Sequence, residues 1–335
     1  MNYQHFIGID VSKLWLDLTL VKQGDVIFHM RVENTLSGIQ LFIKKLKSEK
    51  DFQWELAVFC MEHTGIYNNH LLEFLGKKKA NVCLEPGVQI KQSSGLKRGK
   101  NDKVDAGRIA MYAYKNRDEL KMWKPKREII QQLKHLTTLR ARLINVSKQL
   151  KTPLKETADF VSKKIQKQSV QLCKQTLKSV DKDLKNINNQ IQQVINADPT
   201  LHRLFNIITS IAGVGPVTAS EVIIATNEFK DITCAKKFAC YSGVAPFEHQ
   251  SGSSIKGKTR VSHMGNKTVK KLLHLSALVA VSFNEELKTY YQRKVEEGKN
   301  KMSILNAVRN KLIHRIFACV KQNRLFEKKY QHALA

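Results

Sequence analysis

A long segment without glycine constrains the middle of this chain more than any other feature. Residues 127–197 contain no glycine and a single proline, Pro153, so little interrupts a helix there. Apolar residues in its second half recur at alternating spacings of three and four, which is the heptad pattern of a coiled coil. They are Val170, Cys173, Leu177, Val180, Leu184, Ile187, Ile191 and Val194.

A weaker repeat precedes this pattern and predicts another helix, with Pro153 near the point where the chain turns back. The two helices can pair with each other inside one chain, or they can form a hairpin that joins copies of the chain into a dimer or tetramer. The sequence does not choose between these arrangements. The apolar members of the weaker repeat are Leu133, Leu136, Leu143, Val146 and Leu150.

The residues before this segment follow an α/β order. Alternation in FIGIDVS, LWLDLTLV and DVIFHMRVE predicts three strands, with Gly24 and Asp25 at the turn between the last two. Helix spacing then runs over 37–47 and 67–77, while LAVFCMEHTG and ANVCLEP are typical of strands. The predicted order over the first ~120 residues is β-β-β-α-β-α-β-α, an α/β sandwich.

Glycine and small residues return after Leu201, and Lys and Arg flank a helical pattern near the end of the chain. A length of 335 residues allows more than one domain. We therefore predict an α/β domain over 1–122, a coiled-coil hairpin over 123–200 and a mostly α-helical domain over 201–335.

Net charge indicates the kind of partner. Lys and Arg total 57 against 29 Asp and Glu, which gives a net charge of +28. Such a chain repels itself unless a polyanion neutralises it, and nucleic acid is the commonest polyanion. This imbalance is too large for an ordinary metabolic enzyme. A membrane surface is the weaker alternative because no long apolar run occurs.

The N-terminal sequence MNYQHFIGID lacks the layout of a signal peptide, and the six cysteines form no C-x-x-C pair. We expect reduced thiols in a cytosolic protein. The spacing of Cys234, Cys240, His249 and His263 fits no common zinc pattern, so we interpret their grouping as chance.

Four acidic residues carry the candidate chemistry. Asp10 interrupts an apolar strand, where a charge is costly unless it serves a function. Glu62 follows the apolar run LAVFCM, and Asp102 and Asp105 share one face of a predicted helix because they are three residues apart. Each acid alone has an ordinary explanation, such as a charge at a helix N-terminus. Together, in an order that brings strand ends near one helix, they favour a functional site.

Carboxylates that converge need a cation, and hard oxygen ligands select Mg²⁺ or Mn²⁺. Two such ions ~4 Å apart can activate one oxygen and stabilise another during phosphodiester cleavage. Basic residues flank the acid pair, where a phosphate backbone would run. They are Lys97, Arg98, Lys100 and Lys103.

The segment IAGVGPVTAS opens the last domain. Gly213 and Gly215 permit a tight turn, and Pro216 suits the first position of a helix. The pattern resembles a helix-hairpin-helix element, whose backbone N–H groups hold a DNA or RNA phosphate. A structural joint between two helices is the alternative.

A serine-rich stretch, expected to be flexible, follows at Ser251, Ser253 and Ser254. A serine among cations can attack phosphorus because positive charge stabilises the alkoxide and the transition state. On these residues alone, a polar loop is the better interpretation. The cations that follow are Lys256, Lys258, Arg260, Lys267, Lys270 and Lys271.

These pieces together resemble the DEDD transposases of the insertion-sequence-110 family, which are relatives of the Piv-type invertases. The resemblance covers nearly the whole chain. In the first domain it rests on GIDVSK, MEHTGIY and KNDKVDAGRIA, and in the last on SIAGVGPVTA, FACYSGVAPFEHQSG and HMGNKTVKKLL. The order and spacing of these motifs are more specific than any one of them.

The resemblance implies an RNase H-like (RuvC-like) first domain in which Asp10, Glu62, Asp102 and Asp105 are catalytic metal ligands. It implies that the serine of the SG pair, here Ser251, forms a covalent phosphoserine link to DNA that is then reversed on a new strand. It also implies a structured noncoding guide RNA, active sites built from different protomers, and action at the bacterial nucleoid.

This chain departs from the family pattern at two places. The residues after the SG pair read SGSSIKGK, so Ser253 and Ser254 are rivals to Ser251 as the nucleophile. Lysine binds phosphate as a point charge rather than as a fork, which leaves the transition-state cation open. Lysines stand where family members often carry arginines, namely at Lys267, Lys270 and Lys271.

Three functions therefore remain in competition. The first is an RNA-guided DNA transposase with Mg²⁺ and a serine nucleophile. The second is a RuvC-like metal-dependent nuclease or Holliday-junction resolvase, which hydrolyses DNA with water and needs no serine. The third is a nucleic-acid-binding protein without catalysis.

Overall fold

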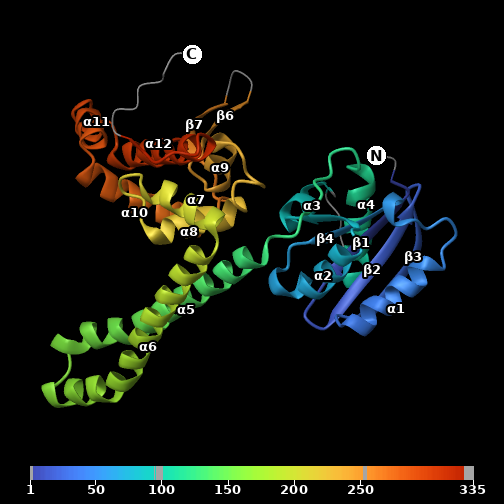
Figure 1. Cartoon of the computed structure of the whole chain (residues 1–335), viewed down its shortest axis with the longest axis horizontal. Helices are drawn as coiled ribbons and strands as arrows, with labels where there is room; N and C mark the ends of the chain where they lie inside the picture. Colours follow the sequence, from blue (N-terminus) through green and yellow to red (C-terminus); the bar gives the residue numbers. More distant parts are fainter. Residues whose placement is uncertain (1–2, 94, 96–100, 252–254, 328–335) are drawn as a thin grey trace. The chain divides into compact units, whose positions relative to one another are not determined.

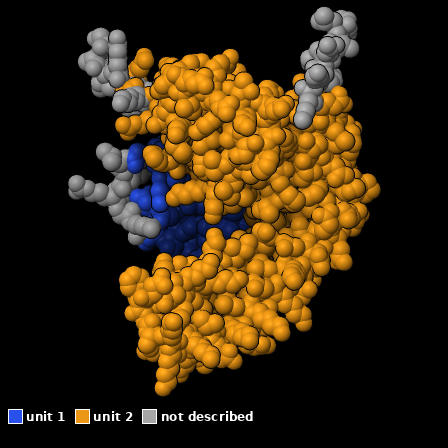
Figure 2. Space-filling model, turned by 90° about the vertical axis from the view of Figure 1, so that its left-hand side faces the viewer, with its two compact units in different colours: residues 1–125 blue, residues 126–335 orange. Residues whose placement is uncertain are grey.

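The computed structural model describes residues 3–93, 95, 101–251 and 255–327. Residues 249, 251, 255, 256 and 258 are described by their backbone only. The chain divides into two compact units, residues 1–125 and residues 126–335 (Figure 2).

The first unit contains a mixed five-stranded sheet with the strand order β3-β2-β1-β4-β5 (Figure 1). Strand β2 is antiparallel to β1 and β3, whereas β1, β4 and β5 are parallel to one another. This topology confirms the predicted α/β order and is consistent with the RNase H-like fold that the resemblance implies. The strands span His5–Val11 (β1), Trp15–Lys22 (β2), Asp25–Glu33 (β3), Ala57–Glu62 (β4) and Asn81–Glu85 (β5).

Helices cover both faces of this sheet. Helices α1 and α2 bury apolar side chains such as Phe42 and Leu71 on one face, and α3 and α4 bury Ile90 and Ile109 on the other. The short helix α3 is additional to the predicted order. The four helices span Leu36–Lys47 (α1), Asn69–Lys77 (α2), Gly87–Ser93 (α3) and Asp102–Lys115 (α4).

Helix α4 lies directly on strand β1 because Gly8 has no side chain. A Cβ atom at Gly8 would lie 2.1 Å from the backbone nitrogen of Ala110 and 2.3 Å from the carbonyl oxygen of Ala106. No real Cβ tolerates such distances. The glycine therefore fixes how closely the start of α4 approaches the strand that carries Asp10.

The second unit begins with a helical hairpin. Helices α5 (Glu128–Glu156) and α6 (Lys163–Ala197) lie side by side within one chain (Figure 1). Pro153 stands in the last turns of α5, which confirms the predicted position of the turn. Pairing inside one chain is thus found, and an additional role in joining copies of the chain stays a prediction.

In the part of the second unit that the structure describes, six further α-helices and one β-hairpin follow, which confirms a mainly helical remainder. Helix α12 is central to its core, with Ile313 and Ile316 fully buried. The helices span Pro199–Thr209 (α7), Pro216–Thr226 (α8), Ala235–Tyr241 (α9), Lys267–Phe283 (α10), Glu285–Glu296 (α11) and Lys301–Lys321 (α12). The hairpin consists of Pro246–Ser251 (β6) and Ile255–Val261 (β7).

Arg127 joins the start of the helical hairpin to the helices that follow. Its guanidinium donates to the carboxylate of Asp198 at 2.7 Å and, through Nε, to that of the buried Glu228 at 3.0 Å. Arg127 lowers the pKa of Asp198 to about 2. The hairpin therefore belongs to the second unit, and the proposed three-domain division stays a prediction. Among the helices of the described residues, none is long and apolar enough to cross a membrane.

The contact at Gly8 gives a direct test of the fold. We expect Gly8→Ala to lower the free energy of unfolding by about 1 to 3 kcal/mol or more, because the new methyl group overlaps the backbone of α4. Gly107→Ala on the same helix is the control: nothing lies within 4 Å of a Cβ there, so we expect stabilisation by about 0.5 to 1 kcal/mol. Urea denaturation measures both, and equal effects would contradict the packing described.

Candidate active site

Asp10 and Glu62 stand at the carboxyl ends of neighbouring parallel strands. Strand β1 pairs with β4 in a register that sets Ile9 opposite Met61, so the next residues of both strands are the two acids. Both acids are half-buried. The sheet thus brings together two carboxylates that are far apart in the sequence.

Asp102 and Asp105 occupy the first turn of α4. The side chain of Asn101 caps this helix by accepting a hydrogen bond from the backbone N–H of Val104 at 2.8 Å. Because α4 lies on β1 at Gly8, its N-terminal turn approaches the end of that strand. The positive end of the helix dipole also favours carboxylates at this position.

The pKa of Asp10 reflects the nearby charges of the other three acids. Burial raises the pKa of Asp10 from its ordinary value of 3.8 to about 6, and the negative charges of Asp102, Asp105, Glu62 and Asp17 contribute to the increase, in that order. All three of the other predicted acids therefore lie near enough to act on Asp10. Like charges held together in this way call for a cation, and their oxygen atoms suit a hard divalent ion.

Two of the four carboxylates pair with arginines in this structure. Arg31 of β3 forms a short ion pair with Asp102, and Arg108 donates to Asp105 at 2.8 Å. Within the described ranges, no group of three or more His, Cys, Asp or Glu side chains is arranged to hold a metal ion. The donor atoms fit a divalent cation chemically, but Asp102 and Asp105 would have to exchange an arginine for it.

Asp17 and Arg31 also belong to this site, although they were not predicted from the sequence. Asp17 lies opposite Asp10 in the antiparallel pair of β1 and β2 and is buried. It accepts a hydrogen bond from Arg31 at 2.9 Å and lies 3.2 Å from the ring of His29. Arg31 therefore bridges a buried structural acid and the candidate ligand Asp102. The available signal was an acid inside the apolar strand LWLDLTLV.

Glu85 is a further acid beside the site. It ends β5 and lies opposite Glu62 in the parallel ladder, where it is buried. The next turn also approaches closely, because a Cβ at Gly87 would lie 2.5 Å from Oε2 of Glu62. Carboxylates thus end three parallel strands at one edge of the sheet.

The basic flank of the acid pair is described only in part. Lys103 lies exposed in the first turn of α4. The other predicted phosphate contacts on this flank, Lys97, Arg98 and Lys100, lie outside the described residues.

The glycine-rich motif of the second unit forms the joint between α7 and α8. Gly213 has a φ of +89°, and a Cβ there would lie 2.5 Å from the carbonyl oxygen of Ser276 in α10. Gly215 precedes α8, and Pro216 occupies its first turn, as predicted. Close packing on α10 thus explains Gly213, while contact with a nucleic-acid phosphate stays a prediction.

Ser251 ends strand β6 and is paired with Ile255 of β7. It therefore belongs to a hairpin rather than to the flexible stretch that the sequence suggested. Alternative nucleophiles Ser253 and Ser254 lie outside the described residues. The acids belong to the first unit and Ser251 belongs to the second.

Cations on β7 and at the start of α10 follow Ser251 in the sequence. Lys267, Lys270 and Lys271 occupy the first turns of α10, and Arg260 lies exposed on β7. None of these four forms an ion pair with a carboxylate in the part of the chain that the structure describes. Lys256 and Lys258 also belong to β7 and are described by backbone only.

Two known protein families match this chain, one over its N-terminal half and one over its C-terminal part. A transposase family named for the DEDD residues of IS110 matches residues 7–162. The family described as transposase IS116/IS110/IS902 matches residues 205–292. The chain belongs to the IS110/IS116/IS902 family of transposases.

Three relatives match this transposase over nearly their whole length. The pilin gene-inverting protein of Moraxella bovis is 28% identical over 97% of this chain and 98% of its own length. The protein of the same name in Moraxella lacunata is 27% identical over the same shares. The 44.8 kDa protein of insertion element IS116 in Streptomyces clavuligerus is 23% identical over 96% of both chains.

The raised pKa of Asp10 predicts a trade-off between stability and function in this transposase. Ionising Asp10 is less favourable in the folded protein than in the unfolded chain. This ionisation therefore does not destabilise the fold below about pH 4, and it destabilises the fold fully above about pH 6. In EDTA, we expect Asp10→Asn to raise the melting temperature at pH 8 by a few degrees and to raise it by clearly less at pH 4.5. Asp25→Asn, at an exposed acid of β3, is the control. A destabilisation at pH 8 would contradict the mutual repulsion described.

Proposed function

We propose that this transposase cuts and rejoins DNA strands at sites chosen by a structured noncoding RNA, using divalent metal ions and a serine nucleophile. The observation that supports it most is the convergence of Asp102, Asp105 and Glu62 on Asp10. A purely structural site would gain nothing from four like charges. The relatives that invert a pilin gene support recombination rather than simple degradation.

Asp10, Glu62, Asp102 and Asp105 would hold Mg²⁺ or Mn²⁺. When bound, two such ions would favour loss of the proton from an attacking hydroxyl and stabilise the oxygen that leaves. Arg31 would then release Asp102 but remain paired with the buried Asp17. The positive charge of Arg31 would thus stay beside the site. Its guanidinium can then meet a DNA phosphate.

Ser251 would carry the covalent step. Its oxygen attacks a DNA phosphorus and loses its proton, the bond from phosphorus to one strand oxygen breaks, and that oxygen takes up a proton. The strand end is then held as a phosphoserine ester. Attack by the hydroxyl of another strand reverses the link and restores the serine, so no external energy source is needed.

The lysines that follow the β6–β7 hairpin, the serine hairpin that carries Ser251, would bind the phosphates. Lys267, Lys270 and Lys271 lie in the first two turns of α10 and would provide point charges to the scissile region. Arg260, Lys256 and Lys258 of β7 would add to them. The joint at Gly213 and Gly215 would offer backbone N–H groups to a neighbouring phosphate.

The net charge of +28 suits two polyanions, the DNA of the element and target together with the guide RNA. We also propose that the α5–α6 hairpin serves as the coiled-coil linker between catalytic domains over 1–122 and 201–335, and that it joins copies of the chain. Acids of one protomer would then meet the serine of another. The protein would work at the bacterial nucleoid.

A trapped covalent adduct tests this function. The substrate is a nicked DNA from which a short strand dissociates once it has been cut, so that the covalent link cannot be reversed. We expect the full-length protein, with Mg²⁺ or Mn²⁺ and a guide RNA, to remain attached to this DNA. Denaturing electrophoresis detects the adduct, and mass spectrometry maps it to Ser251. We expect Ser251→Ala and Asp10→Ala each to lower the yield of the adduct at least about 100-fold. Ser253→Ala is the matched control and should form the adduct like wild type.

The competing functions give different results in the same experiment. Cleavage that survives Ser251→Ala in full would identify a nuclease or resolvase that uses water. Binding of DNA with no metal-dependent cleavage in wild type and Asp10→Ala alike would identify a non-catalytic binder. An adduct mapped to Ser253 or Ser254 would move the nucleophile within the same motif.

A further inference from the structure

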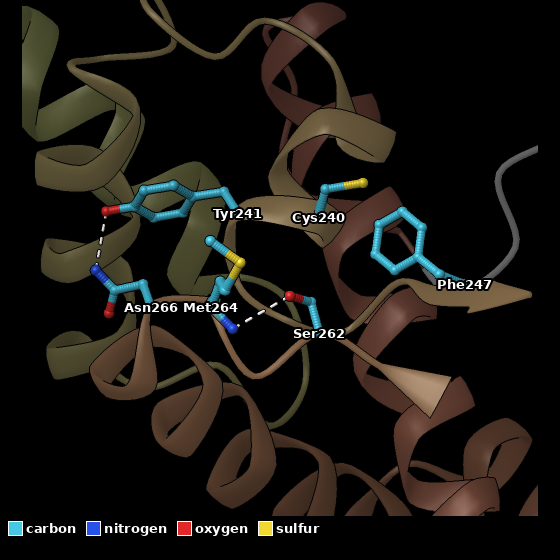
Figure 3. Close-up of a pocket in the computed structure, with 7 residues that line it drawn as sticks. Cys240, Tyr241, Phe247, Ser262, Met264 and Asn266 are labelled. Carbon is cyan, nitrogen blue, oxygen red and sulfur yellow. Dashed lines mark hydrogen bonds between the residues drawn. The ribbon is translucent and has the colours of Figure 1, made fainter. Parts of the chain in front are cut away.

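A hollow lies beside the serine hairpin, between the end of α9, the start of β6 and the segment that joins β7 to α10 (Figure 3). Tyr241 and Phe247 lie on opposite sides of it in this view, with Cys240, Ser262 and Met264 between them. Neither the metal site nor the proposed serine step uses these residues.

The walls of this hollow are apolar side chains that the chain leaves open. Phe247 is 49% exposed, Tyr241 is 38% exposed and Met264 is 70% exposed. An aromatic ring held half-open at a fixed position is favourable when another flat ring completes its contacts. A methionine beside it adapts to different shapes.

The polar groups of the hollow are held in place and can still form hydrogen bonds. Asn266 Nδ2 donates to the hydroxyl oxygen of Tyr241 at 2.9 Å, so the hydroxyl proton of Tyr241 stays available to an acceptor. Ser262 Oγ accepts from the backbone N–H of Met264 at 3.1 Å, and its own proton is available likewise. Both groups can therefore donate to the edge of a base.

Two glycines fix the backbone at this hollow. A Cβ at Gly265 would lie 2.4 Å from the Cα and from the nitrogen of Gly243, so the two backbones cross in direct contact. Gly243 itself has a φ of +64°, which favours glycine. The segment that carries Ser262 and Asn266 is thereby locked against α9 rather than left as a loose loop.

The segment that forms the hollow is strongly basic. Residues 232–275 contain eight Lys and Arg and a single acid, Glu248. Lys236 and Lys237 of α9 lie exposed a few residues before Tyr241, and Lys267 lies exposed directly after Asn266. Among the described residues, none of these three lysines pairs with a carboxylate. An apolar hollow in such a basic segment matches a base joined to a phosphate backbone.

We propose that this hollow, the base pocket, accepts one unstacked nucleobase of the DNA strand that Ser251 attacks, with Phe247 and Tyr241 as its stacking surfaces. Phe247 and Ser251 belong to the same strand, β6, and four residues of strand span ~13 Å. That length covers a few nucleotides, so a strand with its phosphate at Ser251 reaches the base pocket. The proposal deepens the proposed function and rests on it, since it concerns the strand that is cut.

Holding a base outside the stack would position the neighbouring phosphate and prevent the cut strand from re-pairing. The energetic cost of unstacking is recovered by stacking on an aromatic ring, which depends little on the identity of the base. The base pocket would therefore act on position and not on sequence. Phe247 and Tyr241 are positioning residues in this account.

Single-stranded DNA binding to the full-length protein tests the base pocket, measured by fluorescence anisotropy with a labelled 12-nucleotide strand. We expect Phe247→Ala to weaken binding about 5-fold or more and Phe247→Trp to restore it. A strand of equal length whose nucleotides lack bases should bind wild type and Phe247→Ala equally. Phe283→Ala is the matched control, at a phenylalanine that is 81% exposed at the far end of α10.

Equal loss of affinity for the normal and the base-free strand would overturn the base pocket, as would an effect confined to RNA of the same sequence. A Phe247→Ala protein that binds the normal strand like wild type, yet forms the Ser251 adduct, would overturn the base pocket and leave the proposed function intact. A selective loss on the normal strand together with a missing Ser251 adduct in wild type would support the base pocket and overturn the serine mechanism.

Discussion

Direct contact between α4 and β1 at Gly8 is the constraint on which the site depends. Since a side chain at this position would overlap the helix backbone, the helix can approach only where the strand has none. This approach brings Asp102 and Asp105 to the end of the strand that carries Asp10, and the parallel register adds Glu62. The cost is electrostatic, because burial and like charges raise the pKa of Asp10 to about 6.

Arginines offset part of this cost in the structure described here. Arg31 reaches Asp102 from β3 while the buried Asp17 holds its other side, and Arg108 neutralises Asp105 within α4. These pairs stabilise the acids without filling the role of a metal, since arginine cannot activate an oxygen for attack. The second unit shows the opposite imbalance, because Arg260, Lys267, Lys270 and Lys271 form no ion pair with a carboxylate among the described residues. An excess of acids in one unit and of cations in the other both match a substrate that brings metal ions and phosphates with it.

Much of the first unit could be predicted because its strands alternate. The order of strands and helices followed from periodicity. Asp10 was singled out by the cost of burying a charge, Glu62 by its place after an apolar run, and Asp102 with Asp105 by their spacing on one helix face. Arg31 could not be found this way, because its pairing with Asp17 and Asp102 joins residues that only the folded sheet brings together. The β6–β7 hairpin was missed since serine, glycine and lysine dominate residues 251–258 and hide the strand pattern. The two apolar repeats predicted the helices α5 and α6, but only the structure shows that they pair with each other inside one chain.

We propose that four carboxylates from two strands and one helix share divalent ions. Anomalous X-ray scattering from crystals of the full-length protein grown with Mn²⁺ detects such ions directly. We expect manganese peaks within coordinating distance, ~2.0 to 2.3 Å, of oxygens of Asp10, Glu62, Asp102 and Asp105, with Arg31 released from Asp102. Manganese that binds elsewhere, or no peak at saturating Mn²⁺ with the arginine pairs unchanged, would contradict it.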